Sequence, residues 1–349
     1  MTDKKLKTRG IFNDTATINP DKRKIIQGNT TNLNDFNNLA YPWVSEFYRN
    51  SMNNFWIPEE INMSQDIKDY RKLDQYEKHA FDRCISFLTY LDSVQCAYLA
   101  QVMNFITAPE VNLCLTIQAF QEEVHSQSYS YILDSIASPE ERDRILYLFR
   151  DDEVLLKRNE YVGRQYNDLW EKQDEKSFMK SLMASYILEG IYFFYGFAFF
   201  YNLARIGKMP GTVQEIRYIN RDEDVHLFLF RNIINELRQE RPDLFTDELE
   251  EYYRGILRDG VAKEIEWGRY SVGDNITGLN TKMIEDYIHY LGNLRSQEIG
   301  LGYIFEEHRQ EPQSMRWVSE YSDPNAVKSD FFESKVTSYS KASVIEDDL

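Results

Sequence analysis

Residues 122–129 read EEVHSQSY, and residues 222–226 read DEDVH. Each stretch contains a glutamate that is followed three positions later by a histidine: Glu122 with His125, and Glu223 with His226. In an α-helix, positions i and i+3 lie on one face, so each pair presents an oxygen and a nitrogen ligand to a common point. The two pairs therefore predict two metal positions inside a helical protein.

Each pair is preceded by an apolar stretch that carries a single carboxylate. Asp92 lies in LTYLDSVQ, 30 positions before Glu122. Glu189 lies in YILEGIYF, 34 positions before Glu223. Because the two pairs are themselves 101 positions apart, we predict two helical hairpins related by pseudo-symmetry. A carboxylate from each of two helices, with Glu-x-x-His from each of two others, is the ligand set of ferritin-like dinuclear proteins, and here Asp92 replaces one glutamate.

A Glu-x-x-His pair also arises by chance on solvated helix faces, because the chain has 57 acidic residues. One copy alone would therefore be weak support for a metal site. The two copies, however, use two of only five histidines, and each follows an apolar stretch with one carboxylate. We interpret the pairs as metal ligands and the remaining histidines as ordinary residues: His79, His289 and His308.

Four carboxylates and two imidazoles form a ligand set that suits iron or manganese. The set does not match the thiolate-rich or closed tetrahedral sites that are typical of structural zinc. We predict two metal ions per chain, with iron favoured and manganese as the alternative, and redox chemistry with dioxygen as their use. Without cations, four buried carboxylates would repel one another and take up protons, so metal binding is expected to stabilise the fold.

The chain is predicted to be all-α, with a helical bundle at residues 36–309, an extended N-terminal arm at 1–35 and a flexible C-terminal tail at 310–349. The arm and the tail are polar and aperiodic, unlike the bundle. Helical periodicity predicts helices at residues 74–106, 109–136, 139–170, 175–206, 212–240, 247–270 and 281–298. The predicted helix caps are Ser138, Thr246 and Asn280.

The net charge of −17 argues against a nucleic-acid surface or an anionic membrane face, since both require basic patches. The most apolar stretch, YILEGIYFFYGFAFFYNLA, is interrupted by Glu189, which favours a core helix over a membrane span. The cysteines have no C-x-x-C spacing and lie in apolar stretches, which predicts reduced, buried thiols and a cytoplasmic protein: Cys84, Cys96 and Cys114.

Tyr129 lies four residues beyond His125, so its ring falls on the same helix face as the ligands. A phenol beside an oxidising dimetal centre can lose an electron and a proton, and its radical lasts only where apolar neighbours exclude water. Phe193, Phe197 and Ile219 are predicted to form such an apolar wall. The alternative is that Tyr129 is one more core aromatic among 24 tyrosines.

The chain resembles the small, radical-generating beta subunit of class I ribonucleotide reductase over roughly residues 40–349. The resemblance rests on five segments: NNFWIPEE at 53–60, LDSVQ at 91–95, AFQEEVHSQSY at 119–129, LEGIYFFYGF at 188–197 and INRDEDVH at 219–226. It implies a ferritin-like fold and a dinuclear centre with six ligands: Asp92, Glu122, His125, Glu189, Glu223 and His226. It also implies that Tyr129 stores the radical.

By the same resemblance, Asp222 links His125 to Trp56 and gives a path for coupled electron and proton movement. Alternatively, Trp56 anchors the arm to the bundle and Asp222 orients a ligand imidazole. In the tail, Glu333 and Tyr339 are six positions apart, as are the family's glutamate and tyrosine that relay the radical. The acidic terminus resembles the family's docking peptide for the large subunit. A solvated tail with an incidental tyrosine is the alternative.

The resemblance further implies a homodimer and a separate large (alpha) subunit that reduces ribonucleotides to deoxyribonucleotides, and it leaves open an activating flavoprotein. The chain has no P-loop and no cysteine set suited to substrate reduction, so the nucleotide site is expected on the partner. Retention of Tyr129 disfavours a mixed manganese–iron centre, since such members of the family usually have phenylalanine there. Two rival functions remain: a ferritin-like dimetal oxidase without a reductase partner, and a ferritin-like iron store.

Overall fold

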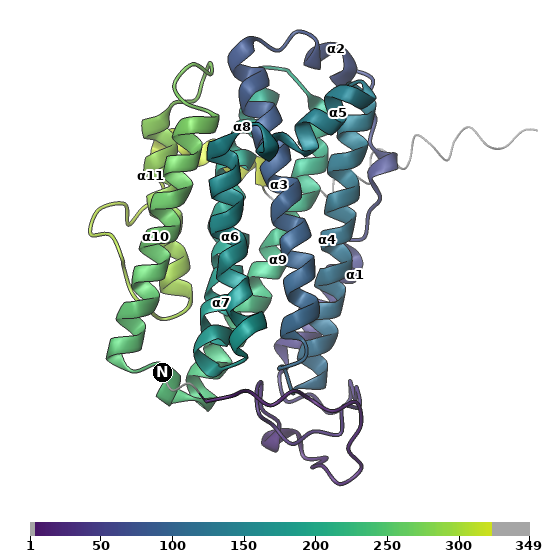
Figure 1. Cartoon of the computed structure of the whole chain (residues 1–349), viewed down its shortest axis with the longest axis vertical. Coiled ribbons are helices and arrows are strands. Elements are labelled where there is room, and N and C mark those ends of the chain that lie inside the picture. The colour runs from purple at the N-terminus through teal and green to yellow at the C-terminus, as the bar shows by residue number, and fades with distance from the viewer. Residues whose placement is uncertain (1–3, 323–349) are drawn as a thin grey trace, which may run out of the picture.

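The computed structural model describes residues 4–322, which form a bundle of long helices (Figure 1). The long helices are α3 (Gln75–Val102), α4 (Pro109–Ile136), α6 (Glu153–Lys172), α7 (Glu175–Ile187), α8 (Phe194–Arg205), α9 (Pro210–Glu240), α10 (Asp247–Ser271) and α11 (Thr281–Glu298). The shorter helices are α1 (Trp43–Asn53), α2 (Asp66–Tyr70), α5 (Pro139–Leu146) and α12 (Arg316–Ser322). Single 3-10 turns lie at Pro20–Lys22, Pro58–Glu60, Leu148–Arg150, Pro242–Leu244 and Gln313–Met315. Within residues 4–322 the only β pairing consists of isolated bridges, so the predicted all-α fold is confirmed.

Most predicted helices are present within a few residues of their predicted ends. Of the predicted caps, Ser138 accepts a hydrogen bond from the Glu141 backbone N–H at 3.3 Å. Asn280 likewise accepts one from the Met283 backbone N–H at 2.9 Å. Thr246 occupies the N-cap position of α10, as predicted, with an extended backbone, but its side chain makes no capping hydrogen bond.

One predicted helix is two helices in the structure. The periodicity predicts a single helix over residues 139–170, but α5 ends at Leu146 and α6 begins at Glu153. Asp152 explains the restart, because its carboxylate accepts the backbone N–H groups of the second and third residues of α6. A side chain that caps backbone donors favours a helix start over a helix interior.

The helix predicted at residues 175–206 is interrupted where the predicted ligand lies. Between α7 and α8, Leu188–Tyr192 form one π-helical turn that contains Glu189. A Cβ atom on the adjacent Gly190 would lie 3.0 Å from both Arg295 Nε and Leu227 Cδ1, so a side chain there would require these neighbours to shift. Such π turns occur frequently at functional sites.

Residues 175–205 are long and apolar enough to span a membrane by length and composition alone. The apolar window is entirely buried inside the bundle, where α7, α8 and the π turn contact α9. This burial is that of a core helix, as the sequence predicts.

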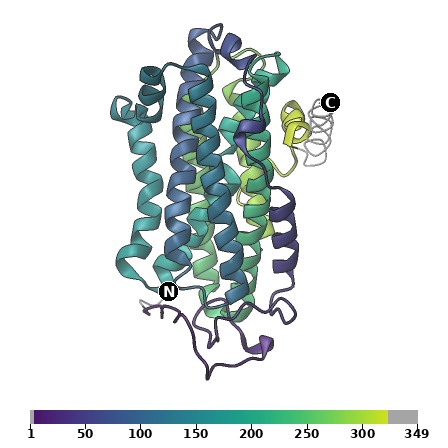
Figure 2. The ribbon, with the colours of Figure 1, turned by 90° about the vertical axis from the view of Figure 1, so that its right-hand side faces the viewer.

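The centre of the bundle is surrounded by α3, α4, α9 and the segment from α7 to α8. Helix α3 packs along α4, and α9 packs against α4, α7 and α8. Figure 2 shows these helices running along the long axis of the molecule. Side chains that point inward from all four segments therefore meet in one place.

The N-terminal arm and the start of the predicted tail both pack on the bundle. The arm covers one end of it (Figure 1), and its side chains of Leu6, Ile25 and Ile26 are buried. At the other terminus, α12 contacts α8 and α9 and buries Val318. Residues 313–322, which belong to the predicted tail of 310–349, thus bury apolar side chains, and the domain bounds stay a prediction.

Candidate metal centre

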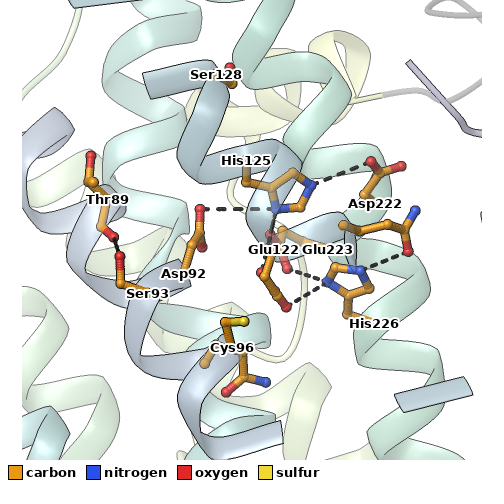
Figure 3. Close-up of polar contacts among 12 residues, drawn as sticks. Thr89, Asp92, Ser93, Cys96, Glu122, His125, Ser128, Asp222, Glu223 and His226 are labelled. Atoms are coloured by element: carbon orange, nitrogen blue, oxygen red, sulfur yellow. Dashed lines mark hydrogen bonds and ion pairs between the residues drawn. The ribbon is translucent and has the colours of Figure 1, made fainter. Parts of the chain in front are cut away.

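The six predicted ligands meet at the centre of the bundle. Figure 3 shows those from α3, α4 and α9: Asp92, Glu122, His125, Glu223 and His226. The six come from α3 (Asp92), α4 (Glu122 and His125), the π turn (Glu189) and α9 (Glu223 and His226). All six side chains are buried, with at most 1% of their surface exposed. Their donor atoms form two overlapping groups whose members lie within 4.8 Å of one another: Asp92, Glu122, His125 and Glu223, and Glu122, Glu189, Glu223 and His226.

Glu122 and Glu223 belong to both groups and so lie between the two metal positions. His125 Nδ1 lies 3.5 Å from Glu122 Oε2 and 3.0 Å from Glu223 Oε1. His226 Nδ1 lies 3.3 Å from Glu122 Oε1 and 2.9 Å from Glu223 Oε2. The two oxygens of each shared glutamate thus face different histidines, as a carboxylate that bridges two metals requires.

Asp92 and Glu189 complete the two groups at their outer ends. Asp92 Oδ2 lies 4.0 Å from His125 Nδ1, and Glu189 Oε2 lies 3.8 Å from His226 Nδ1. The pseudo-symmetry expected from the spacing is therefore present in the geometry, with a shorter aspartate in place of glutamate on α3.

Several inward-facing atoms of this site lack hydrogen-bond partners among residues 4–322. They are both carboxylate oxygens of Asp92, one oxygen each of Glu122, Glu189 and Glu223, and Nδ1 of His125, of which His125 Nδ1 and Glu223 Oε1 lie 3.0 Å apart without hydrogen-bond geometry. A buried polar atom without a partner costs free energy unless an ion or a water molecule satisfies it. This donor set, carboxylates and imidazoles with unpaired inward atoms, fits two divalent metal ions.

The protonation of the site follows from its burial. Burial raises the pKa of Asp92 and Glu189 well above the ordinary range and also raises that of Glu122, and nearby glutamates add to each rise. Burial alone would lower the pKa of His226, but the charges of Glu122 and Glu223 raise it. The metal-free site therefore holds protons, and divalent cations must displace them in order to bind.

The outer side of His125 faces the residues of the predicted electron path. His125 Nε2 lies 3.4 Å from Asp222 Oδ2, and the same oxygen accepts the Trp56 indole N–H at 2.8 Å. The Arg221 guanidinium donates to the other oxygen of Asp222 at 3.2 Å. Burial alone would raise the pKa of Asp222, but the charge of Arg221 lowers it. Trp56, Asp222 and His125 thus form a continuous chain of buried contacts.

Two buried glutamines that the sequence analysis misses hold the Glu189 side of the site. Glu189 Oε1 accepts hydrogen bonds from Gln95 Nε2 at 2.5 Å and from Gln118 Nε2 at 2.7 Å. Gln95 lies three positions after Asp92, and Gln118 lies four positions before Glu122. Their spacing to the ligands on the same helices is the signal that would have identified them.

Tyr129 is fully buried in the C-terminal half of α4. Its hydroxyl makes no well-formed hydrogen bond among residues 4–322, and its polar neighbour is Asp92. Burial raises the pKa of Tyr129 well above its ordinary value, and the charge of the nearby Asp92 raises it further. The residues of the predicted apolar wall are fully buried as well: Phe193, Phe197 and Ile219. The position therefore suits a protected phenol, and its radical role stays a prediction.

A buried carboxyl group that the sequence analysis also misses lies beside the same part of α4. Glu215 of α9 is completely buried and accepts a hydrogen bond from the hydroxyl of Ser128, the residue before Tyr129. Burial raises the pKa of Glu215 to about 8, so the group is mostly protonated at neutral pH. Nothing in the sequence distinguishes it from the other acidic residues of the chain.

Glu215→Gln is expected to make the free energy of unfolding less sensitive to pH. The folded-state pKa of Glu215 lies above the unfolded value of about 4.3, so the folded chain keeps a proton that the unfolded chain releases. As the pH rises from about 5 to about 8, ionisation of Glu215 in the unfolded chain lowers the free energy of unfolding of the parent by about 1.4 kcal/mol per pH unit. The glutamine of the variant makes no such contribution. Denaturation by guanidinium at pH 6 and pH 8 measures the difference. A parent that loses no more stability than the variant would contradict the raised pKa.

The model of the family described as ribonucleotide reductase, small chain, matches residues 33–312. The chain belongs to this family. The ribonucleoside-diphosphate reductase subunit beta of Treponema pallidum is 57% identical, over 99% of this chain and 98% of that relative. The subunit beta of Halalkalibacterium halodurans is 38% identical, over 97% of each chain. The solved ribonucleotide reductase R2 subunit from Clostridium botulinum is 47% identical with a TM-score of 0.89, over 91% of this chain and 99% of that chain.

Membership of the ribonucleotide reductase small chain family confirms the resemblance and the ferritin-like fold. The chain is thus an oxidoreductase subunit, and small subunits of this family work with a large subunit and are typically homodimeric. The predicted tail residues Glu333 and Tyr339 lie outside the described residues. Their relay role, like the roles of Tyr129 and Trp56, stays a prediction.

Proposed function

We propose that this chain is the radical-generating subunit of a ribonucleoside-diphosphate reductase. In this proposal Tyr129 is oxidised beside a dinuclear metal centre, stores the radical and passes the oxidising equivalent to a large subunit that forms deoxyribonucleotides. The observation that carries the proposal is a fully buried phenol whose polar neighbour is Asp92, one of a cluster of six candidate metal-ligating side chains. Family membership supports the reductase activity.

The ligand set supports either of two metals. Two iron ions, or two manganese ions as the alternative, would be held by the four carboxylates and two imidazoles and would activate an oxygen-derived oxidant, which takes the electron from Tyr129. An activating flavoprotein is part of the proposal only in the manganese alternative. The shared Glu122 and Glu223 would hold both ions, and Asp92 with His125 and Glu189 with His226 would each hold one.

Tyr129 must lose its proton together with its electron. Because burial raises its pKa, the phenol is neutral at any physiological pH, and an oxidised but protonated phenol would be a cation in a buried site. Complete burial also keeps water and external reductants away from the ring. These two features support a long-lived radical at this position.

We further propose that the oxidising equivalent leaves through His125, Asp222 and Trp56. The contacts of 3.4 Å between His125 and Asp222 and of 2.8 Å between Asp222 and Trp56 support this path. Asp222 accepts the indole N–H, so it is placed to control the proton of Trp56 while an electron passes.

Trp56→Phe is expected to leave the metal content and the Tyr129 radical unchanged and to abolish most deoxynucleotide formation by the complex. Phenylalanine retains an aromatic ring but lacks the indole N–H that donates to Asp222. The measurement is the turnover rate with the large subunit, beside a radical count by EPR. Trp267→Phe is the matched control, because Trp267 is buried to the same extent. Full turnover by Trp56→Phe would remove Trp56 from the path.

Tyr339→Phe tests the proposed relay in the tail, where Glu333 and Tyr339 have the family spacing. The variant is expected to form the Tyr129 radical normally and to produce no deoxynucleotide with the large subunit. Tyr303→Phe, on an exposed tyrosine of the described part, serves as the control. Unchanged turnover by Tyr339→Phe would refute the relay role and would favour a dimetal oxidase, which needs no such residue.

The whole proposal is tested by reconstitution with the cognate large subunit. The metal-free chain is loaded with Fe(II) in air, or with Mn(II) and an activating flavoprotein, and then mixed with the large subunit and a nucleoside diphosphate. Deoxynucleotide is expected only when the metals and both subunits are present, and His226→Ala, which lacks one ligand, is expected to give none. Metal loading without deoxynucleotide formation in either protocol would contradict the proposal, and uptake of many irons per chain would indicate a storage protein.

A further inference from the structure

The two hairpins of the metal centre place a polar residue at equivalent positions, directly before each shared glutamate. Gln121 precedes Glu122 on α4, and Asp222 precedes Glu223 on α9. The two residues are 101 positions apart, like the ligand pairs themselves. They are therefore related by the same pseudo-symmetry as the ligands.

Each of these residues contacts the histidine of the opposite hairpin. Asp222 of α9 lies with Oδ2 3.4 Å from His125 Nε2, and Gln121 of α4 lies with Oε1 3.1 Å from His226 Nε2. Both histidines direct Nδ1 toward the carboxylates of the metal centre. The pattern is reciprocal, because each Glu-x-x-His helix also supports the histidine of the other one.

The contact from Gln121 fixes the tautomer of the neutral His226 imidazole. A neutral imidazole that offers its Nδ1 lone pair to a metal carries its proton on Nε2, and that N–H needs an acceptor. The amide oxygen of Gln121 is that acceptor. Gln121 is only 5% exposed, so bulk water has little access to replace it.

The two acceptors differ in charge, and this makes the two metal positions unequal. Asp222 is anionic and also binds Trp56 and Arg221. Gln121 is neutral, so it orients His226 without adding negative charge to the ring. A surface pocket of about 280 Å³ is lined by both acceptors, and Ile117 lines it one turn before Gln121.

We propose that Gln121 is a positioning residue for one of the two metal positions, the one formed by Glu189 and His226. Gln121 holds the His226 ring with Nδ1 directed at the metal, as Asp222 does for His125. This inference rests on the dimetal centre of the proposed function. It goes beyond it by assigning a separate support to each metal position.

The test is a titration of the metal-free chain with Mn(II), in which EPR of the free ion gives the affinity of each bound ion. Gln121→Leu removes the acceptor. It is expected to lower the affinity for one of the two ions about 10–100-fold and to change the affinity for the other ion less than threefold. Gln121→Glu restores an acceptor and is expected to bind both ions at least as tightly as the parent. Ile117→Ala, a packing change in the same pocket, is expected to match the parent.

Gln121→Met is the second variant, because methionine keeps the length of the side chain without an amide oxygen. Should the leucine variant fail to fold, the methionine variant is expected to show the same loss of affinity for one ion only. The positioning role would be overturned if Gln121→Leu lowered the affinity for both ions equally or for neither. It would also be overturned if Gln121→Glu bound the ions as weakly as Gln121→Leu. Each of these outcomes would leave the dimetal centre intact. A parent chain that binds fewer than two ions would contradict both the proposed function and this inference.

Discussion

Tyr129→Phe is expected to abolish deoxynucleotide formation by the complete reductase while both metal positions still fill. The phenyl ring preserves the packing of the fully buried side chain and removes only the oxidisable O–H group. The Tyr129 hydroxyl makes no well-formed hydrogen bond among residues 4–322 and has Asp92 as its polar neighbour, so its removal breaks no strong contact. The free energy of unfolding should therefore change by less than about 1 kcal/mol. Turnover with the large subunit, metal content and chemical denaturation measure the three quantities.

The matched control is Tyr195→Phe. Tyr195 is also fully buried, and its hydroxyl likewise has no hydrogen-bond partner among the described residues. It is no part of the metal centre, so Tyr195→Phe is expected to retain turnover. Equal loss of turnover in both variants would mean that a general effect on the core, and not a radical at Tyr129, explains the first result.

Metal loading is expected to raise the free energy of unfolding by about 4 kcal/mol per ion when the free metal concentration is about 1,000 times the dissociation constant. The folded state is stabilised because cations coordinate the unpaired inward oxygens and offset the repulsion among buried carboxylates. The increment should shrink as the pH falls, since burial raises the pKa of Asp92 and Glu189 and protons then compete with the metals. Guanidinium denaturation with and without a chelator, at two pH values, measures it.

Asp92→Asn provides a control for the metal effect. The amide is neutral and nearly isosteric, so the metal-free variant avoids the cost of keeping a fully buried carboxyl group protonated at neutral pH and should be at least as stable as the metal-free parent. The same change removes a ligand, so most of the metal-dependent increment should disappear. An increment of the same size in the parent and in Asp92→Asn would contradict the assignment of Asp92 as a ligand.

The fold and the clustering of the six proposed ligands could be predicted because their signals are local in the sequence. A Glu-x-x-His pair on a helix fixes the relative position of two ligands without reference to the rest of the fold. The single carboxylates Asp92 and Glu189 stand out because their surroundings are apolar. The structure brings all of these residues into one cluster.

The features that sequence reasoning missed depend on contacts between distant segments or on competition between neighbouring helix signals. The break before Asp152 arises because a capping side chain outweighs a continuing helical pattern. The π turn at Glu189 is surrounded by partners from other helices, such as Arg295. Gln121 and Glu215 contact residues 105 and 87 positions away, so spacing on their own helices does not reveal these partners.

The most direct test of the radical assignment is a low-temperature EPR spectrum of metal-free protein that is reloaded with Fe(II) and exposed to air, recorded beside Tyr129→Phe. The predicted result is a tyrosyl signal in the parent that the variant lacks. If iron gives no radical, the same comparison with Mn(II) and an activating flavoprotein is predicted to give one. A signal that persists in Tyr129→Phe, or the absence of a radical under both conditions, would contradict the account.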